Sequence, residues 1–253
     1  MIWSVDVDEY VRMADESDRH WWFEATRALL EQFMGPYLPS AVSSLDETGP
    51  LFLDAGGGTG ATGGWMAARG RTVIADLDGG SLVVAAGRID GIQPVRAELD
   101  RLPHPDDTFD AVLCVTVLCH HLTPDPGVTV RELARVTRPG GVVCLLEPGV
   151  KRLRRGHDRI THTARRFSLA ELRQLVVGAG MQPVRSTAAY SFLVPPAALM
   201  AVVERGRSTS DVGRNQSGLG GSLGALAKLE RAWLRRWNLP AGLSVLTIGR
   251  KPG

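Results

Sequence analysis

Short apolar runs, separated by residues that form turns, recur along most of the chain. A strand buried on both faces of a parallel sheet reads as such a continuous run, whereas a half-exposed strand alternates. Segments with the apolar spacing of helices lie between several of these runs. The pattern therefore predicts an α/β protein with a largely parallel sheet. The expected strands are residues 51–53, 73–75, a stretch ending near 95–97, and residues 109–115, 142–146, 182–190 and 243–249.

The first apolar run reaches an acidic residue and then breaks into glycines. Asp54 stands at the carboxyl end of its expected strand, where open α/β sheets bind ligands. Gly56, Gly58 and Gly60 can adopt positive φ and leave room for a ligand to approach the backbone. This stretch is typical of a nucleotide-binding turn, and a helix is expected directly after it, at residues 59–69.

Two cofactor classes fit this turn. Residues 58–63 match the G-x-G-x-x-G pattern of dinucleotide-binding folds, with Asp76 downstream to bind a ribose. Residues 54–60 resemble the first motif of class I S-adenosylmethionine (SAM) methyltransferases, in which an acidic residue precedes G-x-G-x-G.

Three further stretches resemble motifs of the same methyltransferase family. Residues 73–76 resemble its second strand and the acid that binds the ribose. Residues 102–110 resemble its L-P-F-P-D-x-x-F-D motif, and residues 138–141, Arg-Pro-Gly-Gly, match the turn before its fifth strand. The resemblance covers residues 51–147 and implies a Rossmann-like, seven-stranded class I methyltransferase sheet with helices on both faces and an antiparallel last strand.

The resemblance also implies where SAM would lie. Asp76 would accept hydrogen bonds from both ribose hydroxyls, with Asp78 as the competing acid. Glu98 and Leu99 stand where the family contacts the adenine, and His121 matches a histidine that follows the fourth strand. The full set expected at the cofactor is Arg27, Asp54, Gly56, Gly58, Gly60, Asp76, Leu77, Glu98, Leu99, Val115 and His121.

The N-terminal part of the chain carries an unusual aromatic group. Residues 1–50 are expected to form a helical lid and a linker, with one helix over residues 6–34, ahead of a methyltransferase domain at residues 51–253. Three consecutive aromatic residues, beginning with Trp21 and Trp22, cannot all face one side of a helix. They either anchor the helix on the sheet or cover the cofactor and its substrate.

A subset of bacterial methyltransferases has a similar H-W-W-F-x-x-x-R stretch ahead of the first motif. By that resemblance Arg27 would pair with the methionine carboxylate of SAM, a role that suits the fork geometry of a guanidinium.

Residues 148–167 are expected to lie on the substrate side of the domain. The same subset of methyltransferases carries H-D-x-x-x-x-H-x-x-R-R there, which this chain reproduces at His157, Asp158, His162, Arg165 and Arg166. The histidines would deprotonate a hydroxyl with the acid orienting one of them, and the arginines would bind an anionic group or fix the segment to an acid. His120 is the next candidate base. Two histidines and one acid without cysteine are a weak metal signal, and no metal site is predicted.

Residues 191–242 are expected to be an insertion between strands six and seven. Its apolar part, residues 192–203, is interrupted by two prolines and would form a wall of the substrate site or a homodimer surface. Residues 223–237 predict an amphipathic helix in which Trp233 and Trp237 pack in the core. As a basic amphipathic helix it could instead touch a membrane surface or an apolar substrate.

The charge, the cysteines and the apolar runs of the chain limit which partners and which cell compartment are expected. The formal charge of +2 is too small to imply nucleic acid as an obligatory partner. The three cysteines do not form a disulfide framework, and as buried reduced thiols they favour the cytoplasm. Residues 1–10 show no signal peptide, and no apolar run approaches the roughly 20 residues of a membrane span.

The function expected from these observations is methyl transfer from SAM to a small molecule, most simply to a hydroxyl oxygen of a hydrophobic or anionic compound. The tetrad that amino-group methyltransferases place after the fourth strand is absent, because residues 114–117 read Cys-Val-Thr-Val. Nitrogen or carbon methylation, a non-methylating reaction such as cyclisation, and a nicotinamide-dependent oxidoreductase are the alternatives.

Overall fold

The computed structural model describes residues 7–39, 49–151, 153, 163–203 and 220–253. Seven strands form one sheet in the order β3-β2-β1-β4-β5-β7-β6. Strand β7 is antiparallel to both of its neighbours, and the other pairs are parallel. The predicted fold class, including the antiparallel last strand, is confirmed. The strands are β1 (Leu51–Ala55), β2 (Arg71–Asp76), β3 (Ile92–Arg96), β4 (Phe109–Val115), β5 (Thr137–Pro148), β6 (Gln182–Ala189) and β7 (Ser244–Arg250).

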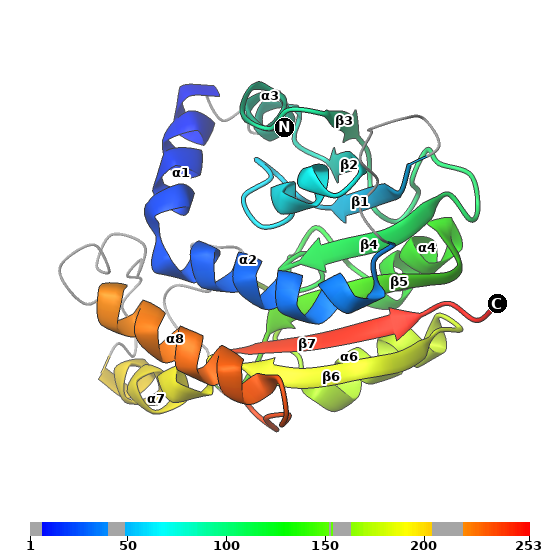
Figure 1. Ribbon diagram of the computed structural model, residues 1–253. Helices are drawn as coiled ribbons and strands as arrows, with labels where there is room; N and C mark the ends of the chain where they lie inside the picture. Colours follow the sequence, from blue (N-terminus) through cyan, green and yellow to red (C-terminus); the bar gives the residue numbers. More distant parts are fainter. Residues whose placement is uncertain (1–6, 40–48, 152, 154–162, 204–219) are drawn as a thin grey trace.

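Helices cover both faces of the sheet (Figure 1). On one face, α2 (Trp21–Met34) and α8 (Gly220–Leu234) run across the strands; on the other lie α4 (Pro126–Val136) and α6 (Leu169–Gly178). Alternate residues of β5 enter the two cores: Val143 and Leu145 pack on the α4 and α6 side, Cys144 and Leu146 on the α2 and α8 side. Burial on both faces explains why β5 reads as a continuous apolar run.

The predicted N-terminal helix is two helices. Helix α1 (Val7–Arg19) stands across the end of the sheet to which β1 and β4 point, and α2 follows at an angle to it (Figure 1). The break falls at His20, whose extended backbone and Nδ1 atom cap α2 by accepting the amide of Trp22 at 3.2 Å. A side chain that competes for backbone hydrogen bonds explains why the helix restarts there.

The helix predicted at residues 59–69 is wrong. The chain forms a series of turns and then a short 3₁₀ helix, η2 (Gly64–Ala68). Gly60, Gly63 and Gly64 each lie so close to a neighbouring side chain that a Cβ atom would overlap it. These glycines allow close packing, but they also lower the helical propensity of the segment.

The segment before β7 is mostly helical where it is described. It contains η3 (Ser191–Leu193), α7 (Val194–Val203) and α8, with the two prolines in the first turn of α7. Trp233 and Trp237 are 57% and 60% exposed, so the expectation that they pack in the core is wrong. The core face of α8 instead carries Ala227 and Leu234.

Two of the motifs that resemble the methyltransferase family join neighbouring strands away from the glycine turn. Arg138, near the start of β5, donates from Nη1 to both carboxylate oxygens of Asp110 in β4, at 3.0 Å each. Asp110 also accepts the amide of Leu51, the first residue of β1. These motif residues therefore align three strands.

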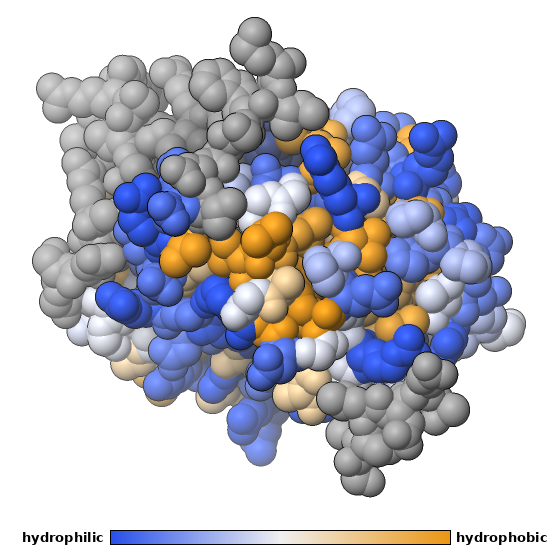
Figure 2. All heavy atoms as spheres, turned by 90° about the horizontal axis from the view of Figure 1, so that it is seen from above, coloured by the Kyte–Doolittle hydropathy of each residue, from blue (hydrophilic) through white to orange (hydrophobic). Residues whose placement is uncertain are grey.

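Helix α3 (Gly79–Arg88) and β3 lie at the edge of the sheet opposite β6. Hydrophobic residues gather in the middle of the face seen from that side (Figure 2). Leu77 and Val83, which are 44% and 62% exposed, belong to this part of the chain. Within the described residues, no helix has the length and apolar character needed to cross a membrane.

Candidate functional site

The glycine turn follows β1 at the carboxyl end of the parallel strands. Gly56, Gly58 and Gly60 have φ values of 75°, 54° and 76°, in the region that favours glycine, as predicted. The Gly56 amide donates to the carbonyl of Ala75 in the adjacent strand at 2.7 Å. A Cβ atom at Gly56 would overlap Val117, so the turn also requires glycine for space.

Asp54 lies beneath this turn and is only 1% exposed. A Cβ atom at Gly57 or Gly63 would overlap its Oδ2 atom, so the turn wraps closely around the carboxylate. Oδ2 has no hydrogen-bond partner among the described residues. Burial, and then the neighbouring carboxylate of Asp76, raise the pKa of Asp54 to about 7. An unpartnered buried carboxylate at the tip of β1 is a feature that a ligand or water can satisfy.

Asp76 ends β2 beside the turn. Its Oδ2 atom accepts the amide of Gly58 and its Oδ1 atom accepts the amide of Asp78, both at 2.9 Å. Burial raises the pKa of Asp76, and these hydrogen bonds partly oppose that shift. A carboxylate has about four acceptor positions, so Asp76 keeps acceptor capacity for a ligand hydroxyl. Asp78, the competing acid, is occupied as the cap of α3, where its Oδ1 atom accepts the amide of Ser81.

The remaining predicted cofactor residues surround the same strand tips. The amide of Ala97 donates to the carbonyl of Asp76, which brings the chain after β3 against β2. Leu99 then approaches Gly56, whereas Glu98 and Leu77 are exposed beside it. Val115 ends β4 and is buried.

The loop after β4 is held by Glu147, which sequence reasoning had treated only as the end of a strand. Its fully buried carboxylate accepts the amides of Val117, Leu118 and Cys119 at 3.1, 2.8 and 3.0 Å. Burial outweighs these bonds and raises the pKa of Glu147 to about 7. The available signal was an acid directly after a buried apolar run, the same pattern that had identified Asp54.

Arg165 holds the same loop from its carbonyl side. Its Nη1 atom donates to the carbonyl of Thr123 at 2.7 Å and, more weakly, to that of Leu118 at 3.5 Å. Arg166 donates to the carbonyl of Gly149 at 3.0 Å. Both guanidinium groups therefore hydrogen-bond to backbone carbonyls, a use that the sequence did not predict; binding of an anionic acceptor by either stays a prediction.

His120 and His121 lie on this loop with their rings 4.7 Å apart. His120 is half-buried and its backbone pairs with Thr163, whereas His121 is exposed. The other predicted catalytic residues, His157, Asp158 and His162, lie outside the described residues. Cys114, Cys119 and Cys144 are buried and unpaired, as predicted, and burial raises the pKa of each thiol.

The aromatic group on α2 is divided between core and surface. Trp21 is 9% exposed and meets Tyr190 edge to face, with 6.1 Å between ring centroids. It therefore anchors α2 on the sheet, one of the two alternatives that the sequence left open. Trp22 is half-buried against Phe23, and its contact with a substrate stays a prediction.

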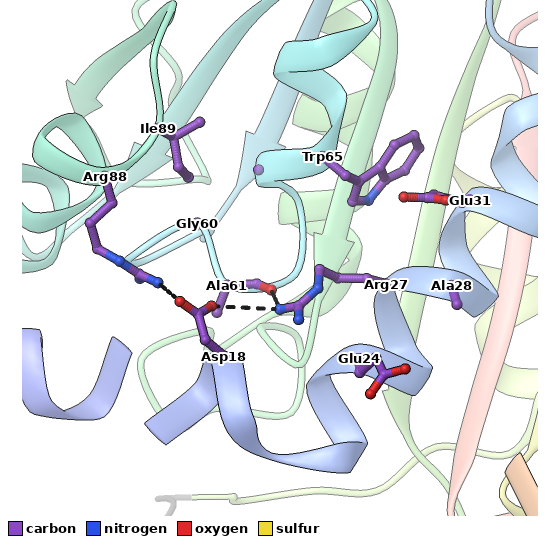
Figure 3. A pocket seen from close by; sticks show the side chains of 11 residues that line it. Asp18, Glu24, Arg27, Ala28, Glu31, Gly60, Ala61, Trp65, Arg88 and Ile89 are labelled. Carbon is purple, nitrogen blue, oxygen red and sulfur yellow. Dashed lines mark hydrogen bonds and ion pairs between the residues drawn. The ribbon is translucent and has the colours of Figure 1, made fainter. Parts of the chain in front are cut away.

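A cavity of about 520 Å³ lies between α1, α2 and the glycine turn (Figure 3). Arg27 points into it and donates to the carbonyl of Ala61 at 2.9 Å. Asp18 lies between Arg27 and Arg88, at 4.0 Å and 2.5 Å from their guanidinium nitrogens. The structure thus brings Arg27 to the glycine turn, and its pairing with the methionine carboxylate of SAM stays a prediction.

Comparison with known proteins identifies the family. The model of a family described as "Methyltransferase domain" matches residues 53–145. The chain is 30% identical over 220 residues to the ubiquinone biosynthesis O-methyltransferase of Paracidovorax citrulli (strain AAC00-1), covering 81% of this chain and 82% of that protein. The chain belongs to the class I SAM-dependent methyltransferases.

The methyltransferase is also similar to a second sequence relative and to a solved structure. It is 38% identical over 117 residues to the demethylmenaquinone methyltransferase of Clavibacter sepedonicus, and there the match covers 44% of the chain and only 47% of that relative. The geranyl diphosphate C-methyltransferase of Streptomyces coelicolor A3(2) has the same fold, with a TM-score of 0.56 at 15% identity over 88% of this chain and 77% of that one. The chain thus spans about half the length of the first of these relatives.

The residues at the strand tips fit SAM, the cofactor of this family. Asp76 binds the Gly58 amide of the turn and keeps acceptor capacity for the ribose, and Asp54 is buried with one oxygen unpartnered among the described residues. In the methyltransferase these residues would hold the adenosyl part, while Arg27 would meet the methionine carboxylate.

Arg27→Ala is expected to raise the dissociation constant of SAM about tenfold, because a charge-assisted hydrogen bond to the methionine carboxylate would be lost. Isothermal titration calorimetry measures this. Arg88→Ala is the matched control, because Arg88 pairs with the same Asp18 and lines the same cavity. Equal losses in the two variants would show that Arg27 acts only by holding the helices together.

Proposed function

We propose that this protein transfers the methyl group of SAM to the hydroxyl oxygen of a small apolar molecule. The observation that carries the proposal is the loop after β4, which brings a half-buried histidine to the same sheet end as the SAM residues. The relative that matches most of the chain's length is by name an O-methyltransferase, which supports oxygen as the acceptor atom.

SAM supplies a methyl group that its positively charged sulfur has already activated. The protein has to align the acceptor with that methyl group and to exclude water, which by itself can account for several kcal/mol of the barrier. A hydroxyl acceptor also needs its proton removed as the new bond forms. His120 can take that proton, because a neutral imidazole nitrogen placed beside the acceptor can act as a general base.

Glu147 and Arg165 support this role from opposite sides of the loop. The carboxylate binds three of its amides and the guanidinium binds three of its carbonyls. A loop held at both its donors and its acceptors keeps His120 in one place, and precise placement of the base is what proton transfer requires.

His120→Gln is expected to lower kcat about a hundredfold or more while leaving the dissociation constant of SAM within twofold, since general-base assistance contributes roughly 10²- to 10⁴-fold. The measurement is the rate of S-adenosylhomocysteine formation with saturating SAM and acceptor. His121→Gln, on the same loop and predicted to contact SAM, is the comparison, because it should weaken SAM binding rather than lower kcat. His157→Gln and His162→Gln are tested in parallel, because the sequence names these residues first. If none of the three candidates lowers kcat by more than about tenfold, the proposal of a histidine base is wrong.

Carbon methylation is the second candidate. The structural neighbour that acts on geranyl diphosphate is by name a C-methyltransferase, and the demethylmenaquinone methyltransferase relative is by name an enzyme that methylates a quinone. The test uses SAM labelled with ¹³C in the methyl group and a set of apolar phenols and quinols. The ¹³C chemical shift of the product distinguishes an oxygen-bound from a carbon-bound methyl group. Consumption of acceptor without any S-adenosylhomocysteine would indicate a non-methylating reaction instead.

A further inference from the structure

Helix α8 presents an apolar stripe to solvent. Leu226, Leu229, Trp233 and Trp237 are 44%, 68%, 57% and 60% exposed. Their spacing of three, four and four residues places them on one line along a helix. The Trp237 amide donates to the carbonyl of Trp233, so the helical turn continues past the last residue of α8 and the two rings lie 6.3 Å apart.

The apolar stripe is separate from the face by which α8 joins the protein. Ala227 and Leu234 are buried in the core, and Glu230 turns inward to accept the amides of Tyr190 and Ser191. Helix α8 packs beside α2 and lies at the outside of the molecule (Figure 1). The packing of α8 against the core therefore does not use the apolar stripe. Among the described residues, its two tryptophans are not part of the buried core.

The charges around the stripe indicate the kind of partner. Residues 220–240 contain four basic residues and one acid. That acid is Glu230, whose carboxylate is engaged with the backbone inside the protein. Arg235 and Arg236 are exposed in the last turn, between the two tryptophans in sequence. Lys228 is paired with Glu24 of α2 at 3.8 Å, but within the segment itself the exposed charges are all positive and lie beside the apolar side chains.

We propose that the apolar stripe binds an anionic membrane surface, with α8 lying in the plane of the interface. An amphipathic helix of this kind buries its apolar residues at the boundary of the acyl chains while its basic residues meet acidic headgroups. Tryptophan is enriched at that depth, because its ring is apolar and its N–H is polar. From Leu226 to Trp237 the stripe is about 16 Å long at 1.5 Å per residue, which leaves it too short to span a bilayer but suited to lie on one.

The same charges argue against a second copy of this chain as the occupant. Apposing two such helices would bring eight basic residues together without an exposed acid from either segment. Membrane binding does not rest on the proposed methyl transfer, and it can be tested without SAM or an acceptor.

The experiment is flotation of the full chain with vesicles of phosphatidylcholine alone and with vesicles that also contain phosphatidylglycerol. We expect binding to the anionic vesicles, weaker binding to the neutral ones, and a blue shift of tryptophan fluorescence on binding. The double variant Trp233→Ala/Trp237→Ala should lower the partition coefficient at least about tenfold, and Arg236→Gln about fivefold on anionic vesicles only. Val83→Ala, at an exposed apolar residue on α3, is the matched control and should bind like the unchanged protein.

All these substitutions are at exposed positions, so the thermal unfolding midpoint should not move. Failure of the unchanged protein to bind either vesicle would overturn the proposal. Equal binding by the double variant would place the contact elsewhere on the molecule. A dimer in light scattering that the double variant abolishes, without any effect of vesicles, would assign the stripe to a second copy.

Discussion

Asp76→Ala is expected to raise the dissociation constant of SAM by about ten- to a hundredfold, which makes it one of the two largest effects that we predict. The carboxylate stands at the tip of β2, hydrogen-bonded to the glycine turn, and the ribose hydroxyls of SAM would use its remaining lone pairs. Hydrogen bonds to a charged group are worth roughly 1.5–3 kcal/mol, which sets the range. Isothermal titration calorimetry with SAM and with S-adenosylhomocysteine measures the change.

Asp78→Ala is the control for that result. It removes an acid only two residues away, but one whose side chain caps α3. Loss of such a cap costs about 1 kcal/mol of stability and should leave SAM affinity within about twofold. Asp76→Asn tests whether folding explains any loss, because the amide keeps the shape of the side chain and one acceptor oxygen. If Asp78→Ala weakens SAM binding as much as Asp76→Ala does, the ribose contact is assigned to the wrong acid.

Glu147→Gln is expected to destabilise the protein by about 1–3 kcal/mol and to displace the loop that carries His120. The carboxylate accepts three backbone amides inside the protein, whereas an amide side chain must turn its NH₂ group toward at least one of those donors. A buried donor left without an acceptor costs about 1–3 kcal/mol. Urea unfolding measures the stability, and a fall in kcat larger than the change in the KM for SAM would report the displaced loop.

The pH dependence of that difference gives a sharper test. Glu147 has a pKa of about 7 in the fold and an ordinary value of 4.5 in the unfolded chain. Between these values the unfolded chain loses its proton first, so the free energy of unfolding falls as the pH rises from 4.5 to 7, by up to about 3 kcal/mol. Glutamine does not titrate. The stability difference between the unchanged protein and Glu147→Gln should therefore shrink over this pH range.

Glu132→Gln should show the opposite sign. Arg135 lowers the pKa of Glu132, so the stabilising contribution of that carboxylate is present above its ordinary pKa and is lost as the pH falls below it. Asp54, whose pKa is also about 7, contributes equally to both proteins in each comparison. A stability difference for Glu147→Gln that does not change between pH 4.5 and 7 would show that the carboxyl is charged at lower pH than the structure implies.

Hydrophobic periodicity predicted the strands well, but it failed at one turn and at one helix. Periodicity located most strands to within a few residues, because the central strands are buried on both faces and largely apolar, whereas β3 and β6 at the edges of the sheet are partly exposed. The same rules failed at residues 59–69 and at Trp233 and Trp237. In the first case, packing around Asp54 outweighs local helical tendency; in the second, an apolar residue at helical spacing does not reveal which side of its helix is covered.

What the sequence determined alone is the sheet, its glycine turn and the two acids at neighbouring strand tips, because burial patterns and glycine positions are local properties of the chain. The tertiary structure decided which backbone and side-chain groups the distant charged residues bind. Glu147 and Arg165 hold the amides and carbonyls of one loop, and Arg138 aligns strands through Asp110. The partners in these pairs are 28 to 47 residues apart, and no spacing rule in a sequence says which carboxylate or guanidinium will meet which backbone group once the chain has folded.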